Sequence, residues 1–314
     1  MSANWERGLG CVSPRPAVGL KRSWGFRQAL LLGLFLLSTL AQAADRLPLW
    51  EAQSAQGTLY LFGSIHVCKA SCFPLPGAAL KRLKASQALV VELDPQNPEV
   101  QTKLLMAAQL PAGQSLEKLL SAGDWRAFKD TSAQLGMPVE ILAGMQPWMA
   151  GTVLTLMAAQ RSGFETAQGV DLALMAEAAE YGLPLEELET AEEQIAAFSA
   201  GGAEAQRKSL RQSVDLLHSG RLAPYLEHLL QAWRAGDAAR LQSLLAETLP
   251  PDSEIARALI ERRNLRMAER LDRKMQDRRS RFVVVGVGHL VGPQSIPALL
   301  AKRGYRVRQL STAD

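Results

Sequence analysis

The sequence predicts an α/β fold with a mixed central β-sheet, flanking helices and a mainly helical insertion in the middle of the chain. The first observation behind this prediction is a unit of strand, Gly-x-x-His turn, helix and strand that occurs twice. The second is the region between the two units, roughly residues 98–279, where Leu-rich stretches are separated by Gly and Pro as in short helices. We therefore expect a single domain over residues 44–314 that contains a helical subdomain.

Residues 1–43 are expected to be a secretory signal peptide. Basic residues precede an apolar stretch over residues 29–40, which is too short to span a bilayer. Residues 41–43 (Ala-Gln-Ala) then form a small-x-small cleavage site. The pattern predicts a periplasmic or secreted protein with no stable membrane span after cleavage.

The first unit begins with an apolar strand expected over Leu59–Phe62. Gly63 and Ser64 open a turn, and His66 stands three residues after the glycine. Residues at the end of a buried strand often build sheet-based sites, so His66 is a candidate site residue. The alternative is that His66 only satisfies local backbone groups. The unit is completed by a helix over residues 78–85 and a strand over residues 89–93.

Cys68 and Cys72 are the two cysteines that remain after the signal peptide. In an oxidising compartment this close pair predicts a disulfide on the loop that leaves His66. Its stabilisation should be small because the closed ring is short. Soft-metal binding by His66 together with both thiols is the alternative.

Glu92 follows the apolar run of residues 88–91. An acid there is costly unless it is paired, bound to a ligand or placed at the exposed tip of the strand. One helix separates this strand from that of His66, so we expect the two strands to be neighbours and Glu92 to converge with His66. The alternative is that an acid in this segment, Asp94 foremost, caps the following loop.

The helical insertion contains further candidates. Asp171 opens a predicted helix, where it either complements the helix dipole or joins the site. Residues 183–188 predict a short strand that returns to the sheet, with Glu189 at its end. His218 and His228 lie in amphipathic helices and are expected at the surface or between helices.

The second unit repeats the first near the carboxyl end of the chain. Phe282–Val285 reads as a fully buried strand, Gly286 and Gly288 favour a tight turn, and His289 is expected at the strand's end. The two units together could place two imidazoles opposite each other. The second unit is completed by a helix over residues 296–302 and a strand over residues 305–310.

Charge and motifs exclude several classes of protein. The chain has 35 Lys and Arg and 31 Asp and Glu, but residues 1–43 hold five of the bases and one of the acids, which leaves 30 of each. A net charge near zero gives no support for nucleic-acid binding or for a polybasic membrane patch. The sequence has no H-E-x-x-H, G-x-S-x-G, P-loop or dinucleotide fingerprint, which argues against the standard zincins, α/β-hydrolases and nucleotide enzymes.

Seven segments fall in an order that is shared with a known family: LYLFGSIHV, VVELD, PWMAGTVLTLM, GVDLAL, YLEHLLQAWRAGD, ERRNLRMAE and VVVGVGHLVGP. In these segments the chain resembles the TraB/GumN family, which includes the pheromone-shutdown proteins and the Tiki-type metalloproteases. The resemblance covers roughly residues 47–310. The cysteine pair departs from the common pattern of that family.

The resemblance implies site roles for three more residues. Glu189 matches the acidic site residue of the family, and Arg263 and Asn264 match an Arg-Asn pair that is thought to face the site. Independently of the resemblance, two imidazoles and a carboxylate form a donor set that suits a divalent ion such as Mn, Co, Fe or Zn. The predicted metal ligands are His66, Glu92 and His289.

We therefore expect an exported metal-dependent hydrolase whose substrate is a peptide or protein, as similarity to the Tiki-type proteases implies. Glu92 and Glu189 are assigned to ligation or base work, and Arg263 and Asn264 to oxyanion or substrate positioning. Two alternatives stay open. One is a non-catalytic protein that sequesters a peptide signal or a metal, and the other is a metal-free, esterase-like site in which His and Glu activate water directly.

Overall fold

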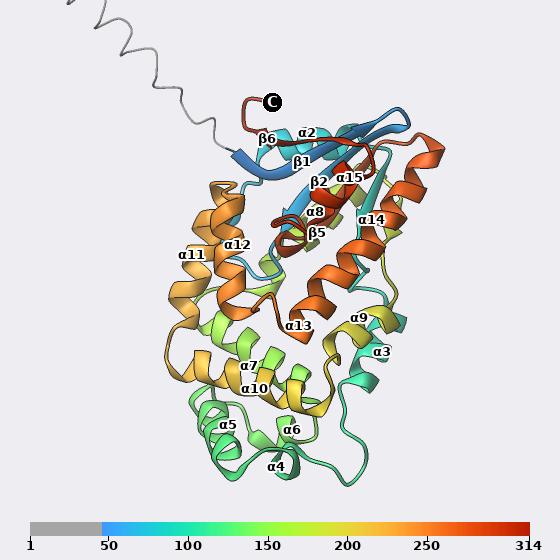
Figure 1. Cartoon of the computed structure of the whole chain (residues 1–314). Coiled ribbons are helices and arrows are strands. Elements are labelled where there is room, and N and C mark those ends of the chain that lie inside the picture. Colours follow the sequence, from blue (N-terminus) through green and yellow to red (C-terminus); the bar gives the residue numbers. More distant parts are fainter. Residues whose placement is uncertain (1–45) are drawn as a thin grey trace, which may run out of the picture. The chain divides into compact units, whose positions relative to one another are not determined.

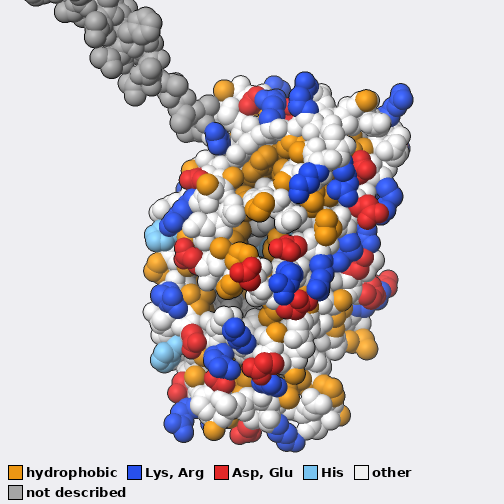
Figure 2. Space-filling model, in the orientation of Figure 1, with side chains coloured by type: hydrophobic (Ala, Val, Ile, Leu, Met, Phe, Trp, Pro, Cys, Tyr) orange, Lys and Arg blue, Asp and Glu red, His pale blue; other side chains and the backbone are white. Residues whose placement is uncertain are grey.

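The computed structural model describes residues 46–314, and the predicted signal peptide over residues 1–43 lies outside this range. Across the described residues, no helix combines the length and the apolar character that crossing a membrane requires. Lys and Arg side chains intermingle with Asp and Glu on the face in Figure 2, as the balanced charge of this part of the chain leads one to expect.

A mixed sheet of six strands forms the upper part of Figure 1, in the order β4-β3-β5-β2-β1-β6. Strands β4, β3, β5 and β2 are parallel to one another, whereas β1 pairs antiparallel with both β2 and β6. The predicted α/β class with a mixed sheet is therefore confirmed. The strands are β1 (Arg46–Ser54), β2 (Gly57–Ser64), β3 (Ala88–Val91), β4 (Leu185–Glu187), β5 (Arg281–Gly286) and β6 (Arg306–Ser311).

Two features of the sheet differ from the predictions. Strand β1 was not foreseen, because the segment over residues 46–54 contains Pro48 and lacks a clear two-residue alternation. The Glu92 strand, β3, does not lie beside the His66 strand, β2, because β5 lies between them. Strand β5 takes this central place since its residues 281–285 are all buried, as in a strand covered on both faces.

Helices pack around the sheet and extend below it in Figure 1. One core cluster joins the sheet to the adjacent helices, and a second, smaller cluster lies in the insertion, among α4 to α7 and α10. The α-helices are α2 (Gly77–Ala85), α3 (Pro98–Ala107), α4 (Leu116–Leu119), α5 (Ala122–Gln134), α6 (Val139–Ala143), α7 (Pro147–Arg161), α8 (Val170–Glu180), α9 (Ala191–Phe198), α10 (Gly202–His218), α11 (Leu222–Arg234), α12 (Ala238–Thr248), α13 (Glu254–Ala256), α14 (Arg262–Lys274) and α15 (Ile296–Lys302).

The parallel pair β2 and β5 places the two Gly-x-x-His turns at one edge of the sheet. In its register, Gly63 is opposite Val285 and Ser64 is opposite Gly286. Gly63 is required here because a Cβ on it would lie 2.7 Å from a methyl carbon of Val287. The two turns therefore begin next to each other at the same end of the parallel strands. This agrees with the expectation that the duplicated unit could bring the two histidines together.

Arg281 fixes the opposite end of β5. Its guanidinium is buried and donates to the carboxylates of Glu186 in β4 and of Asp277, and to the carbonyl oxygen of Lys274. Burial of a cation is tolerated only where such partners replace water. Arg281 thus links the central strand to the strand at the edge of the sheet and to the turn after α14.

Replacing Arg281 with Ala should lower the free energy of unfolding by about 2–4 kcal/mol, because the carboxylates of Glu186 and Asp277 each lose a buried partner and Glu186 keeps only Lys274. Chemical denaturation of the purified mature protein measures this change. Arg279→Ala is the matched control, since Arg279 is exposed and its Nε lies 3.8 Å from Asp277, and it should change stability by less than about 0.5 kcal/mol. Equal effects of the two substitutions would contradict a structural role for Arg281.

Candidate functional site

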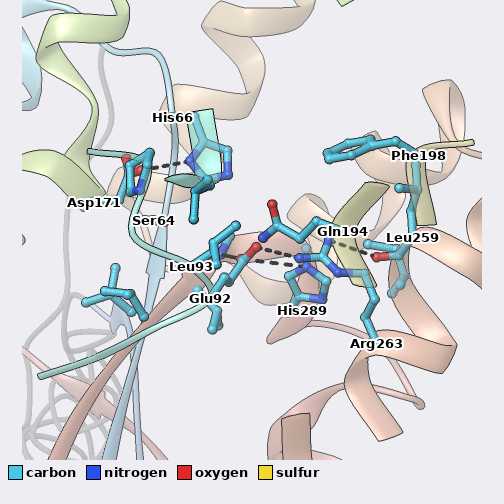
Figure 3. A pocket seen from close by; sticks show the side chains of 18 of the residues that line it. Ser64, His66, Glu92, Leu93, Asp171, Gln194, Phe198, Leu259, Arg263 and His289 are labelled. Carbon is cyan, nitrogen blue, oxygen red and sulfur yellow. Dashed lines mark hydrogen bonds and ion pairs between the residues drawn. The ribbon is translucent and has the colours of Figure 1, made fainter. Parts of the chain in front are cut away.

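Three side chains from different parts of the chain, those of His66, Glu92 and His289, lie near Gly286. Figure 3 shows these three side chains in the pocket that they line. A Cβ placed on Gly286 would lie 3.4 Å from Glu92 Oε1, 3.6 Å from His66 Nε2 and 3.8 Å from His289 Cδ2. His66 follows β2, Glu92 follows β3, and His289 ends the turn after β5. These three strands are neighbours in the sheet, in the order β3-β5-β2. The structure thus brings together the three residues that the sequence predicted as metal ligands.

His66 is oriented by Asp171, which lies in the first turn of α8. The His66 Nδ1 to Asp171 Oδ2 distance is 3.1 Å, and 65 % of the His66 side chain is open to solvent. The start of α8 reaches His66 because Gly169 has no side chain, whose Cβ would lie 2.9 Å from the His66 carbonyl oxygen. The two alternatives for Asp171 are therefore compatible, because it lies in the first turn of α8 and also contacts His66 at the site.

His289 is buried and is oriented by Asn264 of α14. Its Nδ1 lies 2.6 Å from Asn264 Oδ1, while Asn264 Nδ2 donates to the carbonyl oxygen of Gln294 at 2.8 Å. Because the amide nitrogen is used as that donor, Asn264 Oδ1 is an acceptor and His289 Nδ1 must carry the hydrogen. The lone pair of His289 is therefore on Nε2, 3.7 Å from Glu92 Oε1.

Glu92 is held at both carboxylate oxygens. The backbone N–H of Gly286 donates to Oε1 at 2.6 Å, and Arg263 Nη2 donates to Oε2 at 2.6 Å. Burial by itself would raise the pKa of Glu92, but the charges of His289, Arg263 and His66, together with the Gly286 hydrogen bond, lower it to about 2. Glu92 is thus an ionised carboxylate at neutral pH.

The two imidazoles have opposite pKa shifts. Burial lowers the pKa of His289 to about 4, against the attraction of Glu92. Partial loss of solvation at His66 would also lower its pKa. The hydrogen bond and charge of Asp171 and the charge of Glu92 outweigh this effect and raise the pKa of His66 to about 9. Solvent screens these charges at the exposed His66 ring, so the direction of that shift carries the argument.

Glu189 and Arg263 form a buried ion pair behind Glu92. Arg263 Nε donates to both Glu189 oxygens at 3.0 Å and Nη2 donates to Oε2 at 2.5 Å. Glu189 also accepts from the amide of Gln194 at 3.4 Å, and its side chain is fully buried. The pairing raises the pKa of Arg263 despite burial.

These contacts show where the structure places three residues that the resemblance assigned to the site. The Glu189 carboxylate pairs with Arg263 behind Glu92. Both ends of the Asn264 amide are hydrogen-bonded, one to His289 and the other to the carbonyl oxygen of Gln294. Arg263 lines the cavity and orients Glu92.

A cavity of about 380 Å³ opens over His66, Glu92 and His289. Its floor holds two buried oxygens with no hydrogen-bond partner among the described residues, Ser64 Oγ and Asp171 Oδ1. Unpartnered buried oxygens are uncommon and point to a water, ion or ligand that completes them. Of the predicted glycines, Gly286 and Gly288 line the cavity, and Gly63 underlies the turn.

The walls of the cavity are apolar and were not foreseen from the sequence. They come from α3, α8 and α9 and from the segment that ends at α14. The signal was present only as ordinary amphipathic helix faces, which do not reveal which cavity a helix covers. The wall residues include Val100, Leu104, Met175, Phe198, Leu249, Leu259 and Ile260.

Cys68 and Cys72 form the predicted disulfide. The alternative of soft-metal binding by these thiols with His66 is excluded, because the two sulfurs are bonded to each other. Cys68 also exchanges two backbone hydrogen bonds with Glu165, which fixes the loop between His66 and α2.

Comparison with known proteins identifies the family. The profile of the TraB/PrgY/gumN family matches residues 48–309. The chain belongs to this family. The matched range contains each of the site residues described above, so the TraB/PrgY/gumN assignment covers the sheet, the insertion and the cavity together.

Among TraB/PrgY/gumN relatives, the uncharacterized protein YbaP of Escherichia coli K12 is 30% identical over 243 residues, which covers 77% of this chain and 87% of YbaP. Metalloprotease TIKI2 of Danio rerio is 26% identical over 299 residues, and that of Xenopus tropicalis is 25% identical over 304 residues. Each match covers 79% of this chain but 57% of the TIKI2 protein. No solved structure shows significant similarity.

The arrangement and the chemistry of the His66, Glu92 and His289 side chains indicate how well the site fits a metal ion. Within residues 46–314, no three His, Cys, Asp or Glu side chains are arranged to hold an ion, since Glu92 turns toward Arg263 and the Gly286 amide. The chemistry of the donors does fit. Each imidazole has its Nδ1 hydrogen-bonded to an oxygen, so Nε2 is the nitrogen that could bind an ion when the ring is neutral, as in metal-binding histidines. His66, whose pKa is raised, would release a proton on binding. Ser64 Oγ is buried with no partner among the described residues.

Glu189→Gln should lower the free energy of unfolding by about 3–5 kcal/mol, because it removes one charge of a buried pair and leaves Arg263 partly unpaired. Denaturant titration followed by circular dichroism measures the loss. Glu192→Gln is the control, because Glu192 is 62 % exposed and pairs with Lys103 at the surface, so a much smaller change is expected. A loss no larger than that of the control would show that the Arg263 pair is dispensable.

Proposed function

We propose that this protein is a metal-dependent hydrolase of peptide bonds. The observation that carries the proposal is the convergence of His66, Glu92 and His289 around Gly286, at the floor of a cavity large enough for part of a substrate. The named metalloproteases among its relatives support the reaction class.

His66, His289 and Glu92 would hold the ion, with Ser64 Oγ available to a water beside it. A divalent ion supplies two effects at such a site: it lowers the pKa of a bound water toward 7 and polarises the carbonyl of the substrate. Asp171 and Asn264 keep both Nε2 atoms directed into the cavity. Arg263 keeps Glu92 ionised and places a positive charge at the wall where negative charge develops in the transition state.

The two mechanisms differ in the base that they need. Without a metal, Glu92 or a histidine would have to deprotonate ordinary water, whose pKa is near 15.7, whereas efficient general bases have pKa values near the operating pH. A bound divalent ion would instead lower the pKa of the water, and the named metalloproteases among the relatives favour this alternative.

Export to an oxidising compartment is part of the proposal. Residues 1–43 have the pattern of a signal peptide, and the disulfide between Cys68 and Cys72 is of a kind that persists outside the reducing cytosol. A peptide or protein in the periplasm or outside the cell would then be the substrate.

His66→Ala, His289→Ala and Glu92→Gln should each lower kcat/KM for peptide hydrolysis by about 100-fold or more, because each removes a donor from the site. The assay uses the purified mature protein, a fluorogenic peptide pool, and Mn, Co or Zn added after chelation. His218→Ala is the matched control, since His218 ends α10 far along the chain from the site and does not line the cavity.

The outcomes separate the three functions. Chelation should abolish hydrolysis and added metal should restore it. Full activity after thorough chelation would favour the metal-free site, and capture of peptides without turnover would favour a sequestering protein.

Asp171→Ala and Asn264→Ala should each lower metal affinity or kcat by about 10- to 100-fold, the usual cost of removing a residue that orients a ligating histidine. Isothermal titration with Mn or Zn measures the affinity. Asp171→Asn keeps an oxygen acceptor for His66 and should recover most of the loss. If Asp171→Asn and Asp171→Ala behave alike, hydrogen bonding by Asp171 is not what orients His66.

A further inference from the structure

A second cavity adjoins the one over the histidines. It has a volume of about 300 Å³ and lies among α12, α13, the segment before α14 and the loop after His289. Leu249, Ile260 and Gly288 line both cavities and so form the boundary between them. Figure 2 shows a hollow on this face, between α12 and α14, with hydrophobic and acidic side chains at its edge.

The second cavity is apolar in character. Apolar side chains line most of it: Leu245, Ala246 and Ala256 from α12 and α13, and Val291 from the loop. The polar side chains that line it are the amides of Gln242 and Gln294 and the carboxylate of Glu261. Glu261 is the only charged residue among its lining residues. A cavity with such walls gains free energy by excluding water when an apolar group enters, in proportion to the apolar area buried.

Gly288 makes the two cavities close neighbours. It directly precedes His289, and a Cβ on it would lie 3.5 Å from Leu245 Cδ1 and 3.6 Å from Ile260 Cδ1. Any larger side chain would extend into this boundary. A substrate whose reacting bond lies over His289 thus has one neighbouring group within reach of the apolar cavity.

We propose that this cavity is a specificity pocket that takes one large apolar side chain, such as Leu, Met or Phe, of a peptide bound over His66, Glu92 and His289. The inference rests on the proposed hydrolase function, because the shared boundary is what ties the occupant to the reacting bond. The chemistry of the walls and the continuity with the first cavity identify the occupant. A polar or acidic side chain would lose most of its hydration there, with Gln242, Glu261 and Gln294 as its partners in an otherwise apolar lining.

The pocket can be filled from α12. Ala246→Phe places a ring in the cavity, whereas Ala246→Ser changes polarity with little change of volume. Ser243→Phe on the same helix is the matched control, because Ser243 is exposed and lines neither cavity. Circular dichroism and thermal unfolding establish that each variant is folded, and Ala246→Leu replaces Ala246→Phe if the larger ring prevents folding.

The first measurement is turnover of a random peptide pool by the metal-loaded mature protein, with cleavage sites read by mass spectrometry. We expect Leu, Met or Phe over Gly at one fixed position near the cleaved bond, with kcat/KM about 10- to 100-fold higher. In Ala246→Phe this preference should fall to about 3-fold or less, while cleavage of peptides with Gly at that position stays within about 2-fold of wild type. Ser243→Phe and Ala246→Ser should keep the wild-type preference.

The second measurement is binding without turnover. In saturation-transfer NMR, the peptide acetyl-Ala-Leu-Ala-amide should receive saturation on its leucine methyl groups with Glu92→Gln protein, and lose most of it when Ala246→Phe is added. Turnover without an apolar preference, or a preference unchanged by Ala246→Phe, overturns the pocket. Absence of all turnover overturns the proposed function alone, and the leucine signal then decides the pocket: it stands if Ala246→Phe removes the signal and falls if it does not.

Discussion

The buried carboxylate of Glu92 is the constraint on which the site depends. A buried anion is stable only when protein groups replace its water, and here the Gly286 amide and Arg263 do so. Arg263 is in turn buried and is fixed by Glu189. This chain of charges connects β3, the end of β4, α14 and the turn after β5, so the geometry of the site and the packing of the sheet cannot be altered independently.

Much of this arrangement could be read from the sequence, because its signals were local. The apolar run before Gly286, the repeated Gly-x-x-His turn and the acid after residues 88–91 each predicted a position that the structure brings to one edge of the sheet. The order of the strands could not be read in the same way. It depends on which strand is covered on both faces, which is a property of the assembled core. Strand β1 was missed because its segment contains Pro48 and lacks a clear alternation, although it forms a hairpin with β2 and also pairs with the distant β6.

The roles of the supporting residues were also beyond local reading. By its type, Glu189 fits ligation or base chemistry, and Arg263 and Asn264 fit contact with a substrate. The structure gives each of them protein partners: Glu189 pairs with the Arg263 guanidinium, and Asn264 lies between His289 and the carbonyl oxygen of Gln294. Arg263 also lines the cavity.

The two histidines follow similar turns but differ in solvent exposure and in pKa, because different helices pack next to them. His66 is open to solvent beside α8, where the hydrogen bond and charge of Asp171 raise its pKa. His289 is buried next to α14, and burial lowers its pKa. In the proposed hydrolase, the open side is where a substrate would enter, and the buried side adjoins the apolar cavity. The sheet fixes the two histidines and Glu92, while helices of the insertion form most of the cavity wall. Relatives can keep the first and vary the second, so that shared histidines need not mean a shared substrate.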